Sequence, residues 1–378
     1  DLINPNTGLT YVTLNAPGLV SPSFTWERTK TLNLGLDAAL FENKLTATLE
    51  WFNRQVNGIL DDGLPLPAVL GTGAPQQNVS DIENKGWEVT LGWRDNIGDD
   101  FSYFVNANVF DIYSSRITNV VNDVRLIGNS NYIGKEYGEI WGLVADGYFT
   151  IDDFEPGSLD ANLENGTLRE GQVYFQGQIP NPGDVKFVDL DGDGVINDQS
   201  NEIDNSQDRK RIGNNRKRYQ FGASAGASYK GFDFSMRLVG VGSADSFVSN
   251  NIFFGYQNQF GNLYKHQLDY WTPENTDAFY PRNYQEGSGN NGRSRKLSTR
   301  YLSDASWLTI QNITVGYTFK KQFVEKFNID KMRISFTAEN PFMFDKLPDG
   351  IHPEFNNLGG GAVYPFRKQL GLGLNLTF

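Results

Sequence analysis

Residues 219–229 read YQFGASAGASY, and they show the pattern on which the fold prediction is based. Every second position carries an aromatic residue or an alanine, and the positions between carry glutamine, glycine or serine. A period of two is typical of a β-strand with one apolar and one polar face. The C-terminal segment 368–378 repeats it more strictly, because leucine or phenylalanine alternates there with glycine, asparagine and threonine.

The same alternation recurs along the chain and predicts nine strands of about ten residues each. That length exceeds the roughly five or six residues of an average soluble strand and matches a tilted strand that crosses a bilayer. In one segment the apolar face switches sides, so a β-bulge is expected near Asn312. The predicted strands span residues 32–41, 45–54, 84–93, 101–111, 219–229, 232–242, 306–319, 331–340 and 368–378.

The connections between these strands alternate between short and long. Long structureless loops are rare in compact soluble domains. Outer-membrane barrels, in contrast, join their strands by tight periplasmic turns and long extracellular loops. Short turns are expected at residues 42–43, 94–100, 230–231 and 320–330, and long excursions at 55–83, 112–218, 243–305 and 341–367.

These patterns predict an all-β chain that forms part of a large antiparallel transmembrane β-barrel with long extracellular loops. An odd number of antiparallel strands cannot close a barrel, and an open edge in a bilayer leaves backbone groups unpaired, so we expect the chain to be incomplete. If the short turns are periplasmic, nine crossings place Phe378 at the periplasmic face. Residues 141–149 belong either to an extracellular hairpin or to a further pair of strands, which would raise the count to eleven.

The composition of the 378 residues excludes several classes of protein. A net charge of −12 leaves no basic patch large enough for nucleic acid. The absence of cysteine excludes disulfides and cysteine nucleophiles, and the two histidines, His266 and His352, lack the spacing of a metal or catalytic site, so we expect no enzyme. No apolar run is long enough for a spanning helix. A soluble β-sandwich or propeller remains the alternative, because its strands also alternate.

Residues 189–196 read DLDGDGVI and carry the spacing of a calcium loop. Carboxylates at the first, third and fifth positions, glycine at the sixth and a backbone carbonyl at the seventh match the first part of an EF-hand loop. The twelfth position is Ser200, so Asp198, Glu202 or Asp204 would have to complete the ligand shell. We expect Ca²⁺, with Mg²⁺ less favoured, in a loop at residues 189–204; the alternative is an acidic turn on a solvated loop. The expected ligands are Asp189, Asp191, Asp193, Val195, Asp198 and Glu202.

Two further groups of loop residues leave their role open. Asp152, Asp153 and Glu155 could act as paired carboxylates in acid and base chemistry, but a solvated loop is favoured, and no catalytic residue is assigned. Aromatic residues of the loops could stack on sugars or peptides, or could pack the loops, and they are Tyr256, Tyr264, Tyr270, Trp271, Tyr280 and Tyr284. The residues that bind substrate are therefore not identified.

Six motifs, in order along the chain, resemble those of the SusC/RagA type of TonB-dependent outer-membrane transporter of Bacteroidota. Two positions depart from the family pattern, since Glu339 stands in place of glutamine and Asp191 in place of asparagine; neither changes the assignment. The motifs are Trp26-Glu27 with LNLGLD at 32–37, NKGWE at 84–88, PGDVK at 182–186 leading into 189–196, ASWLTIQNITVGYTF at 305–319, ENPF at 339–342, and the terminal Phe378.

The resemblance implies that residues 1–378 are the C-terminal part of a barrel of about 22 strands, with about thirteen strands upstream. It implies an importer in the bacterial outer membrane that is energised by the TonB complex and takes up oligosaccharides or oligopeptides. A SusD-like surface lipoprotein would be its partner, and outer-membrane lipid would surround it. The upstream portion of the same transporter would carry the plug and the contact with TonB, which nothing in this chain resembles.

Two other functions fit parts of the pattern. One is a self-contained small outer-membrane barrel that acts as a passive pore or an adhesin. The other is a soluble, calcium-stabilised β protein that binds glycans.

Overall fold

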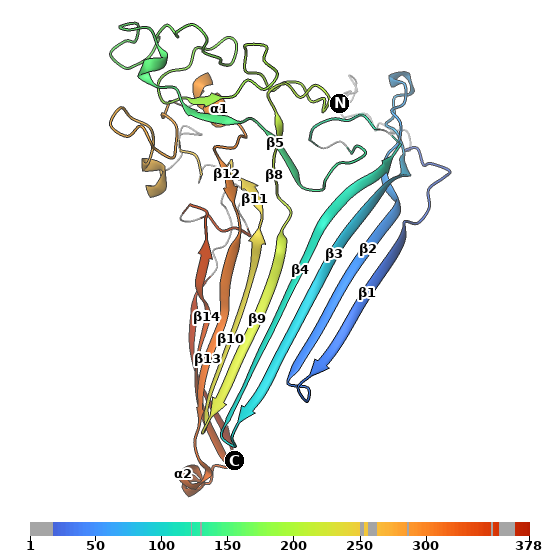
Figure 1. The fold of residues 1–378 in the computed structure, drawn as a ribbon, viewed down its shortest axis with the longest axis vertical. Coiled ribbons are helices and arrows are strands. Elements are labelled where there is room, and N and C mark those ends of the chain that lie inside the picture. The colour runs from blue at the N-terminus through green and yellow to red at the C-terminus, as the bar shows by residue number, and fades with distance from the viewer. Residues whose placement is uncertain are drawn as a thin grey trace, which may run out of the picture.

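The computed structural model describes residues 18–121, 123–128, 131–249, 253–255, 263–285, 287–348, 351–354 and 367–378. Nine long strands form one antiparallel sheet, in which each strand pairs with the next of the nine along the chain. Figure 1 shows them side by side between a short-turn end, where α2 lies, and an end that carries the long loops. They are β1 (Arg28–Leu40), β2 (Leu45–Asp62), β3 (Gln76–Ile97), β4 (Phe101–Val120), β9 (Arg218–Tyr229), β10 (Phe232–Ser243), β13 (Trp307–Thr318), β14 (Lys331–Asp345) and β15 (Gln369–Thr377).

All nine predicted strands are confirmed, but the first hairpins are longer than the alternation indicates. β3 has 22 residues and β4 has 20. Polar contacts extend the hairpins at the long-loop end: Asn53 Nδ2 donates to Glu83 Oε1 at 3.0 Å, and Ser80 Oγ lies 2.8 Å from Asp61 Oδ2. These extensions lack the apolar alternation, so the sequence pattern places them in the loops. The excursions expected at 55–83 and 112–218 therefore begin and end partly within strands.

The sheet has one apolar and one polar face. The register places Leu49 opposite both Leu36 and Val89, so aliphatic side chains line up across the strands. They are exposed: Leu49 keeps 42% and Leu372 of the last strand 85% of its accessible surface. The other face carries polar pairs, and Thr48 Oγ1 donates to Asp37 Oδ1 at 2.7 Å. A sheet that exposes aliphatic residues along one whole face requires an apolar solvent on that side.

Aromatic residues form a belt at the short-turn end of the sheet. The rings of Phe41 and Trp93 lie 6.1 Å apart, and those of Phe232 and Tyr317 4.5 Å apart. Trp93 Nε1 donates to Tyr103 Oη at 3.0 Å. Such amphipathic rings concentrate where a membrane meets water. The belt consists of Phe41, Trp93, Phe101, Tyr103, Tyr229, Phe232, Tyr317 and Phe319.

The short turns have the residues that tight hairpins need. At the β9–β10 turn, Lys230 and Gly231 both have positive φ, 47° and 92°, which matches the twist of the flanking strands. The longest of these turns holds α2 (Lys321–Val324) and η4 (Glu325–Phe327). All four predicted short turns are present, although the one expected at 94–100 is narrower, because β3 continues to Ile97 and β4 begins at Phe101.

The predicted bulge is also confirmed. In the ladder between β13 and β14 the register shifts between Ile310 and Asn312, and in the ladder between β10 and β13 it shifts between Arg237 and Leu238. Gln311 is the extra residue, and it moves the apolar positions of β13 from even to odd numbers.

Above the long-loop end, the connections fold together into what we call the loop assembly, which comprises the described parts of residues 121–217, 244–306 and 346–354. Three short sheets organise it: β5 with β8, β6 with β7, and β11 with β12. The predicted strand at 141–149 divides into β5 and β6, so no further long strand lies in the described part of 112–218, and the count is nine. Its elements are β5 (Glu139–Gly142), β6 (Ala145–Tyr148), η2 (Ile151–Asp153), β7 (Val185–Phe187), β8 (Lys210–Asn214), β11 (Asp245–Phe247), η3 (Lys265–Leu268), α1 (Gly289–Ser294) and β12 (Leu302–Asp304).

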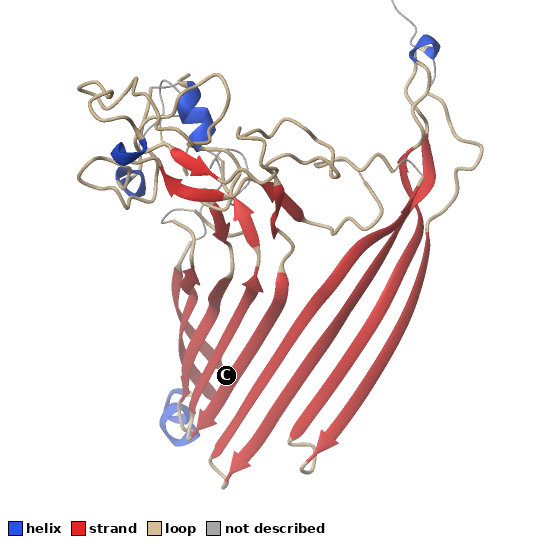
Figure 2. Ribbon diagram, turned by 45° about the horizontal axis from the view of Figure 1, so that its top comes forward, coloured by secondary structure: helices blue, strands red, loops and turns tan. Residues whose placement is uncertain are grey.

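Figure 2 shows the sheet as a curved, open wall, with helices only beyond its two ends. One of these, η1 (Ala68–Leu70), lies at the tip of the β2–β3 hairpin. Within the described residues, β1 and β15 are the edges of the sheet. No helix among those residues is long and apolar enough to span a bilayer.

Candidate functional site

A hydrophobic core joins the two largest connections. Leu143, Phe187 and Ile196 from the first are each at most 5% exposed and belong to one cluster with aromatic residues from the second. Phe254 and Tyr301 meet edge to face, with ring centres 5.0 Å apart and planes at 87°. The loop assembly is thus a packed unit in which the first connection is held against the second.

The segment Asn181–Asp184 forms a tight turn at the centre of this unit. Gly183 has a φ of 93°, and a side chain there would meet the Trp271 ring at 2.4 Å. The backbone N–H of Arg282 donates to Gly183 O at 3.0 Å. Only glycine combines this φ with so close a neighbour, which explains the PGD sequence at this point.

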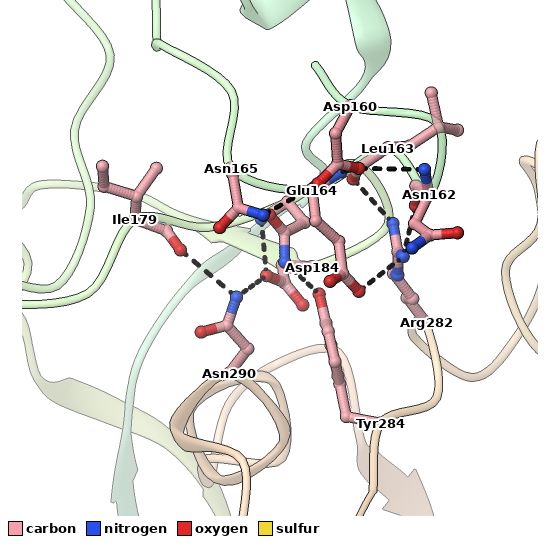
Figure 3. Close-up of polar contacts among 11 residues, drawn as sticks. Asp160, Asn162, Leu163, Glu164, Asn165, Ile179, Asp184, Arg282, Tyr284 and Asn290 are labelled. Atoms are coloured by element: carbon pink, nitrogen blue, oxygen red, sulfur yellow. Dashed lines mark hydrogen bonds and ion pairs between the residues drawn. The ribbon is translucent and has the colours of Figure 1, made fainter.

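Asp184 connects the turn to α1, as Figure 3 shows. Its carboxylate accepts hydrogen bonds from Asn181 N at 2.7 Å, Asn290 Nδ2 at 2.8 Å and Ser294 Oγ at 3.2 Å. The side chain is almost fully buried. This burial raises the pKa of the Asp184 carboxyl to about 6, although the three donors act in the opposite direction.

Arg282 makes a second connection between the two segments (Figure 3). Its guanidinium donates to Asn162 O at 2.6 Å, to Leu163 O at 2.8 Å and to Glu164 Oε1 at 2.9 Å. The turn that it clamps is itself held by Asp160, whose carboxylate accepts from two backbone N–H groups and from a side-chain amide. Arginine suits this role because its fixed fork of donors reaches several acceptors at once.

The predicted calcium loop is a tight acidic turn beside this unit. Asp189 accepts backbone hydrogen bonds from Gly192 N at 2.6 Å and Gly194 N at 2.9 Å, which hold the pKa of its carboxyl below the usual value. Asp191 and Asp193 accept similar bonds from the backbone two residues ahead. The carboxylates therefore hold the turn by accepting hydrogen bonds from backbone N–H groups. Each carboxylate still has lone pairs that could bind a cation.

The structure brings Asp189 and Asp191 together with Asp208, a residue that the loop spacing did not indicate. One carboxylate oxygen of each lies within 4.8 Å of the others. Asp208 is fully buried and accepts from Leu190 N and Asn197 N, both at 2.7 Å. Burial, with the two neighbouring carboxylates, raises its pKa.

The other predicted ligands lie outside this trio. Asp198 forms an ion pair with Lys296 Nζ at 2.7 Å. The carboxylate of Asp193 accepts a hydrogen bond from Asn197 Nδ2. The backbone of Glu202 forms a β-bridge with that of Leu126. Val195, whose backbone carbonyl is the expected ligand, directly follows the turn.

Most of the loop aromatics pack the loop assembly. Trp271 and Tyr280 are each 4% exposed, and the hydroxyl of Tyr284 accepts from Asn181 Nδ2 at 3.1 Å. Tyr270 packs against the core, whereas Tyr264 is exposed and stacks on His266. Tyr256 lies outside the described residues.

The polar face of the sheet is hollowed in two places. The hollow nearer the loop assembly, which we call the wall hollow, has a volume of about 820 Å³ and lies over β3, β4, β9, β10 and β13. The lower hollow, nearer the short turns, has a volume of about 1110 Å³. The aromatic side chain of Phe110 also lines the wall hollow. Its polar lining residues include Glu88, Asn106, Asn108, Gln220, Arg237 and Gln311.

Sequence reasoning missed three parts of this arrangement. Asp208 follows the acidic turn at a distance that no loop motif specifies, because only the folded return of the chain brings it back. Asp184 stands in a recognised motif, but its burial against α1 depends on a contact between residues about 110 positions apart. The wall hollow had a signal, since Asn106, Asn108 and Gln220 all occupy polar positions of alternating strands.

Comparisons with known proteins agree with the fold. Residues 3–183 match the family described as TonB dependent receptor-like, beta-barrel. TonB-dependent receptor P3 of Formosa agariphila is 26% identical over 93% of this chain and 34% of its own length. TonB-dependent receptor SusC of Bacteroides thetaiotaomicron is 24% identical over 98% of this chain and 34% of its own length.

Among solved structures, the RagAB peptide transporter superposes with a TM-score of 0.66 at 22% identity, covering 97% of this chain and 37% of that chain. The RagAB peptide importer in its open-open state gives a TM-score of 0.67 at 22% identity, over 94% of this chain and 35% of that one. The chain thus spans only about a third of the length of the relatives that it matches. The matched domain covers residues 3–183, and the relatives extend the likeness over almost the whole chain, so the chain resembles the TonB-dependent receptor β-barrel family in sequence and in its nine-stranded sheet.

Proposed function

We propose that this chain forms part of the wall and the extracellular loops of an active importer in the bacterial outer membrane. The observation that carries the proposal is the two-faced sheet, whose aliphatic face is exposed and whose polar face is hollowed. A barrel wall needs the first face toward lipid and the second toward the polar interior of the barrel. The aromatic belt would then lie at the periplasmic interface, with the loop assembly outside the cell and Phe378 at the periplasmic side.

The importer would be energised by TonB and would take up oligosaccharides or oligopeptides together with a SusD-like surface lipoprotein. Relatives named TonB-dependent receptors, and the likeness to a peptide transporter, support this assignment. The packed loop assembly offers a rigid surface on which a lipoprotein could dock. An enzyme is not proposed: Asp153 is held by Lys186 at 3.2 Å, and its neighbour Asp152 is exposed.

The remainder of the barrel would come from the same transporter. Within the described residues β1 and β15 are the edges of the sheet, and this arrangement, with the short share of the relatives' length, supports a partial barrel, the C-terminal part of about 22 strands. A sheet with open edges in lipid would leave backbone groups unpaired at several kcal/mol each. The plug and the contact with TonB would lie in the upstream portion.

Uptake in cells that carry the full receptor tests this function. Deletion of the receptor, and separately of TonB, should each abolish uptake of its cargo, whereas a passive pore would keep uptake without TonB. Residues 1–378, expressed alone with a secretion signal, should not show the heat-dependent gel shift of a closed barrel. A shift of that fragment by itself would favour a self-contained small barrel.

We further propose that the acidic turn at 189–204 binds Ca²⁺, with Mg²⁺ as the weaker candidate. Clustered carboxylate oxygens suit this larger, hard cation. Asp189 and Asp191 would supply ligands with Asp208, in place of Asp198, which is engaged with Lys296.

Limited proteolysis of the full receptor tests the calcium proposal. Ca²⁺ should slow cleavage within residues 184–205, because a ligand that binds only the folded loop stabilises it. The double substitution Asp189→Ala with Asp191→Ala should remove this protection and weaken docking of the lipoprotein more than assembly of the barrel. Asp204→Ala is the matched control, because Asp204 pairs with Arg125 and lies outside the trio. Equal cleavage with Ca²⁺ and with a chelator would contradict the proposal.

A further inference from the structure

The polar side chains of the wall hollow have no partner within the described protein. Glu88, Asn106, Asn108, Gln220, Arg237 and Gln311 line it, and none of their side chains forms a hydrogen bond or ion pair with another described residue. The strands that carry them are neighbours in the sheet (Figure 1). Their donors and acceptors therefore face the hollow together and are unpaired within the described part of this chain.

The lower hollow on the same face differs in this respect. Lys44 and Asp95 form an ion pair there at 2.8 Å, and Ser102 and Ser228 share a hydrogen bond at 2.7 Å. Asp233 accepts from Arg333 Nε at 3.0 Å. Several polar groups of the lower hollow thus bind one another, although the side chains of Glu42, Asn43, Arg94 and Ser235 there form no hydrogen bond or ion pair with a described residue, so the two hollows differ in degree.

A planar aromatic surface lies within the wall hollow. Phe110 lines it and stacks on Phe52, with ring centres 6.2 Å apart and planes at 12°. Phe52 lies flat over Gly86, where a Cβ would meet its ring at 2.4 Å. The absence of a side chain at Gly86 therefore lets the pair lie against the wall, and its flat face suits the C–H surface of a sugar ring.

The charges of the wall hollow balance. Glu88 and Glu354 are its acidic residues, and Lys217 and Arg237 its basic ones. A hollow without excess charge does not favour an ionic solute. Side-chain amides both donate and accept hydrogen bonds, as sugar hydroxyls do, so Asn106, Asn108 and Gln220 suit a neutral, hydroxyl-rich solute.

The backbone of the wall is not available to a peptide at this position. β3, β4, β9, β10 and β13 are each paired on both sides in the sheet. A peptide cannot add as a further strand where no edge is free. Recognition here depends on side chains alone.

We propose that the wall hollow is a binding subsite for a neutral oligosaccharide, with one sugar ring stacked on Phe110 and its hydroxyls bound by Asn106, Asn108 and Gln220. The proposal rests on the proposed function, because it names the class of cargo for that importer. The subsite lies below the loop assembly, on the route from the cell exterior into the barrel.

Binding to the purified full receptor in detergent tests the subsite without need of energy or TonB. The probes are a panel of labelled neutral oligosaccharides of glucose, mannose, xylose and galactose, and a panel of labelled mixed-sequence peptides. At least one oligosaccharide should bind the wild type. Phe110→Leu should weaken that binding about tenfold, and Asn108→Ala and Gln220→Ala about threefold to tenfold each.

Matched controls come from the lower hollow. Phe104→Leu and Ser102→Ala make the same kinds of change on the same face, since Phe104 also lies over a glycine, Gly226, and lines the lower hollow. They should leave binding unchanged. The heat-dependent gel shift of every variant shows that the barrel has folded.

Each other outcome overturns the subsite. These outcomes are binding of peptides alone, binding of no probe in either panel, and oligosaccharide binding that resists all three wall-hollow substitutions or responds equally to the controls. TonB-dependent uptake of peptides would leave the proposed function standing and refute only this inference. Sugar binding together with TonB-independent uptake would refute the proposed function and leave the subsite standing.

Discussion

The strand wall and the loop assembly belong to one chain but bury their side chains in different ways. The largest fully buried side chains include Phe149, Phe253, Phe254 and Tyr301, all in the loop assembly. In the wall, Leu34, Leu36 and many other aliphatic residues stay exposed. The loop assembly thus has the core of a soluble protein, whereas the wall relies on its backbone ladder and on an apolar environment.

The two regions should therefore respond to different kinds of substitution. Polar or charged substitutions on the exposed apolar face of the wall should lower its stability, whereas a soluble protein tolerates such substitutions at exposed positions. The loop assembly should be sensitive to its buried polar contacts, of which Asp184 makes the most.

The largest expected effect is a charge on the outer face of the wall. Leu49→Lys should destabilise the assembled barrel by about 2–4 kcal/mol, because the ammonium would lie in lipid. Ile151→Lys is the control: Ile151 is similarly exposed, 48% against 42% for Leu49, but lies in the loop assembly. It should change stability by less than about 0.5 kcal/mol. Urea titration of the full receptor in vesicles measures both, and equal effects would show that the two surfaces face the same solvent.

The next effect is removal of the buried carboxylate. Asp184→Ala leaves Asn181 N and Ser294 Oγ without their acceptor, each at about 1–3 kcal/mol. The loop assembly should become sensitive to protease while the heat-dependent gel shift of the barrel persists. Asp152→Ala, an exposed loop carboxylate, should change neither. Loss of the barrel shift in Asp184→Ala would mean that the two regions do not fold separately.

A smaller effect is the pH dependence of the same group. Folding raises the pKa of Asp184 from 3.8 to about 6, so the folded form binds more protons between these values. Stability of the loop assembly should therefore fall as pH rises from about 4 to 6, by at most about 3 kcal/mol, and stay level above. Hydrogen exchange of loop amides in the wild type and in Asp184→Asn isolates this term, because asparagine does not titrate. Identical pH profiles of the two proteins would contradict the assignment.

The wall could be predicted from the sequence because alternation is local. In residues 219–229 and 370–376, a few positions are enough to tell the apolar face of the strand from the polar one. The shifted apolar positions around Asn312 predict the bulge. The polar ends of β3 and β4 could not be predicted, because their pairing depends on cross-strand contacts such as that of Asn53 with Glu83.

The loop assembly could be predicted only in outline. The DLDGDG turn was visible as a motif, and the structure places Asp189 and Asp191 close together there. Asp208 joins them only through the path of the chain, and Asp198 is drawn away by Lys296 from another loop. Contacts between distant segments decide both positions, and one sequence contains no periodic signal for them.

Cysteine scanning of β9 is the sharpest test of a wall with two different faces, since the chain has no native cysteine. Single cysteines at residues 220, 223, 224, 225, 227 and 228 would be placed in the full receptor, with any cysteine elsewhere replaced, and the protein reconstituted in vesicles. We predict a period of two: cysteines at the Gln220, Ser224 and Ser228 positions react with a water-soluble maleimide, whereas probes at Ala223, Ala225 and Ala227 are quenched by brominated lipid. Uniform labelling, or labelling in the opposite phase, would contradict a wall with lipid on one face and water on the other.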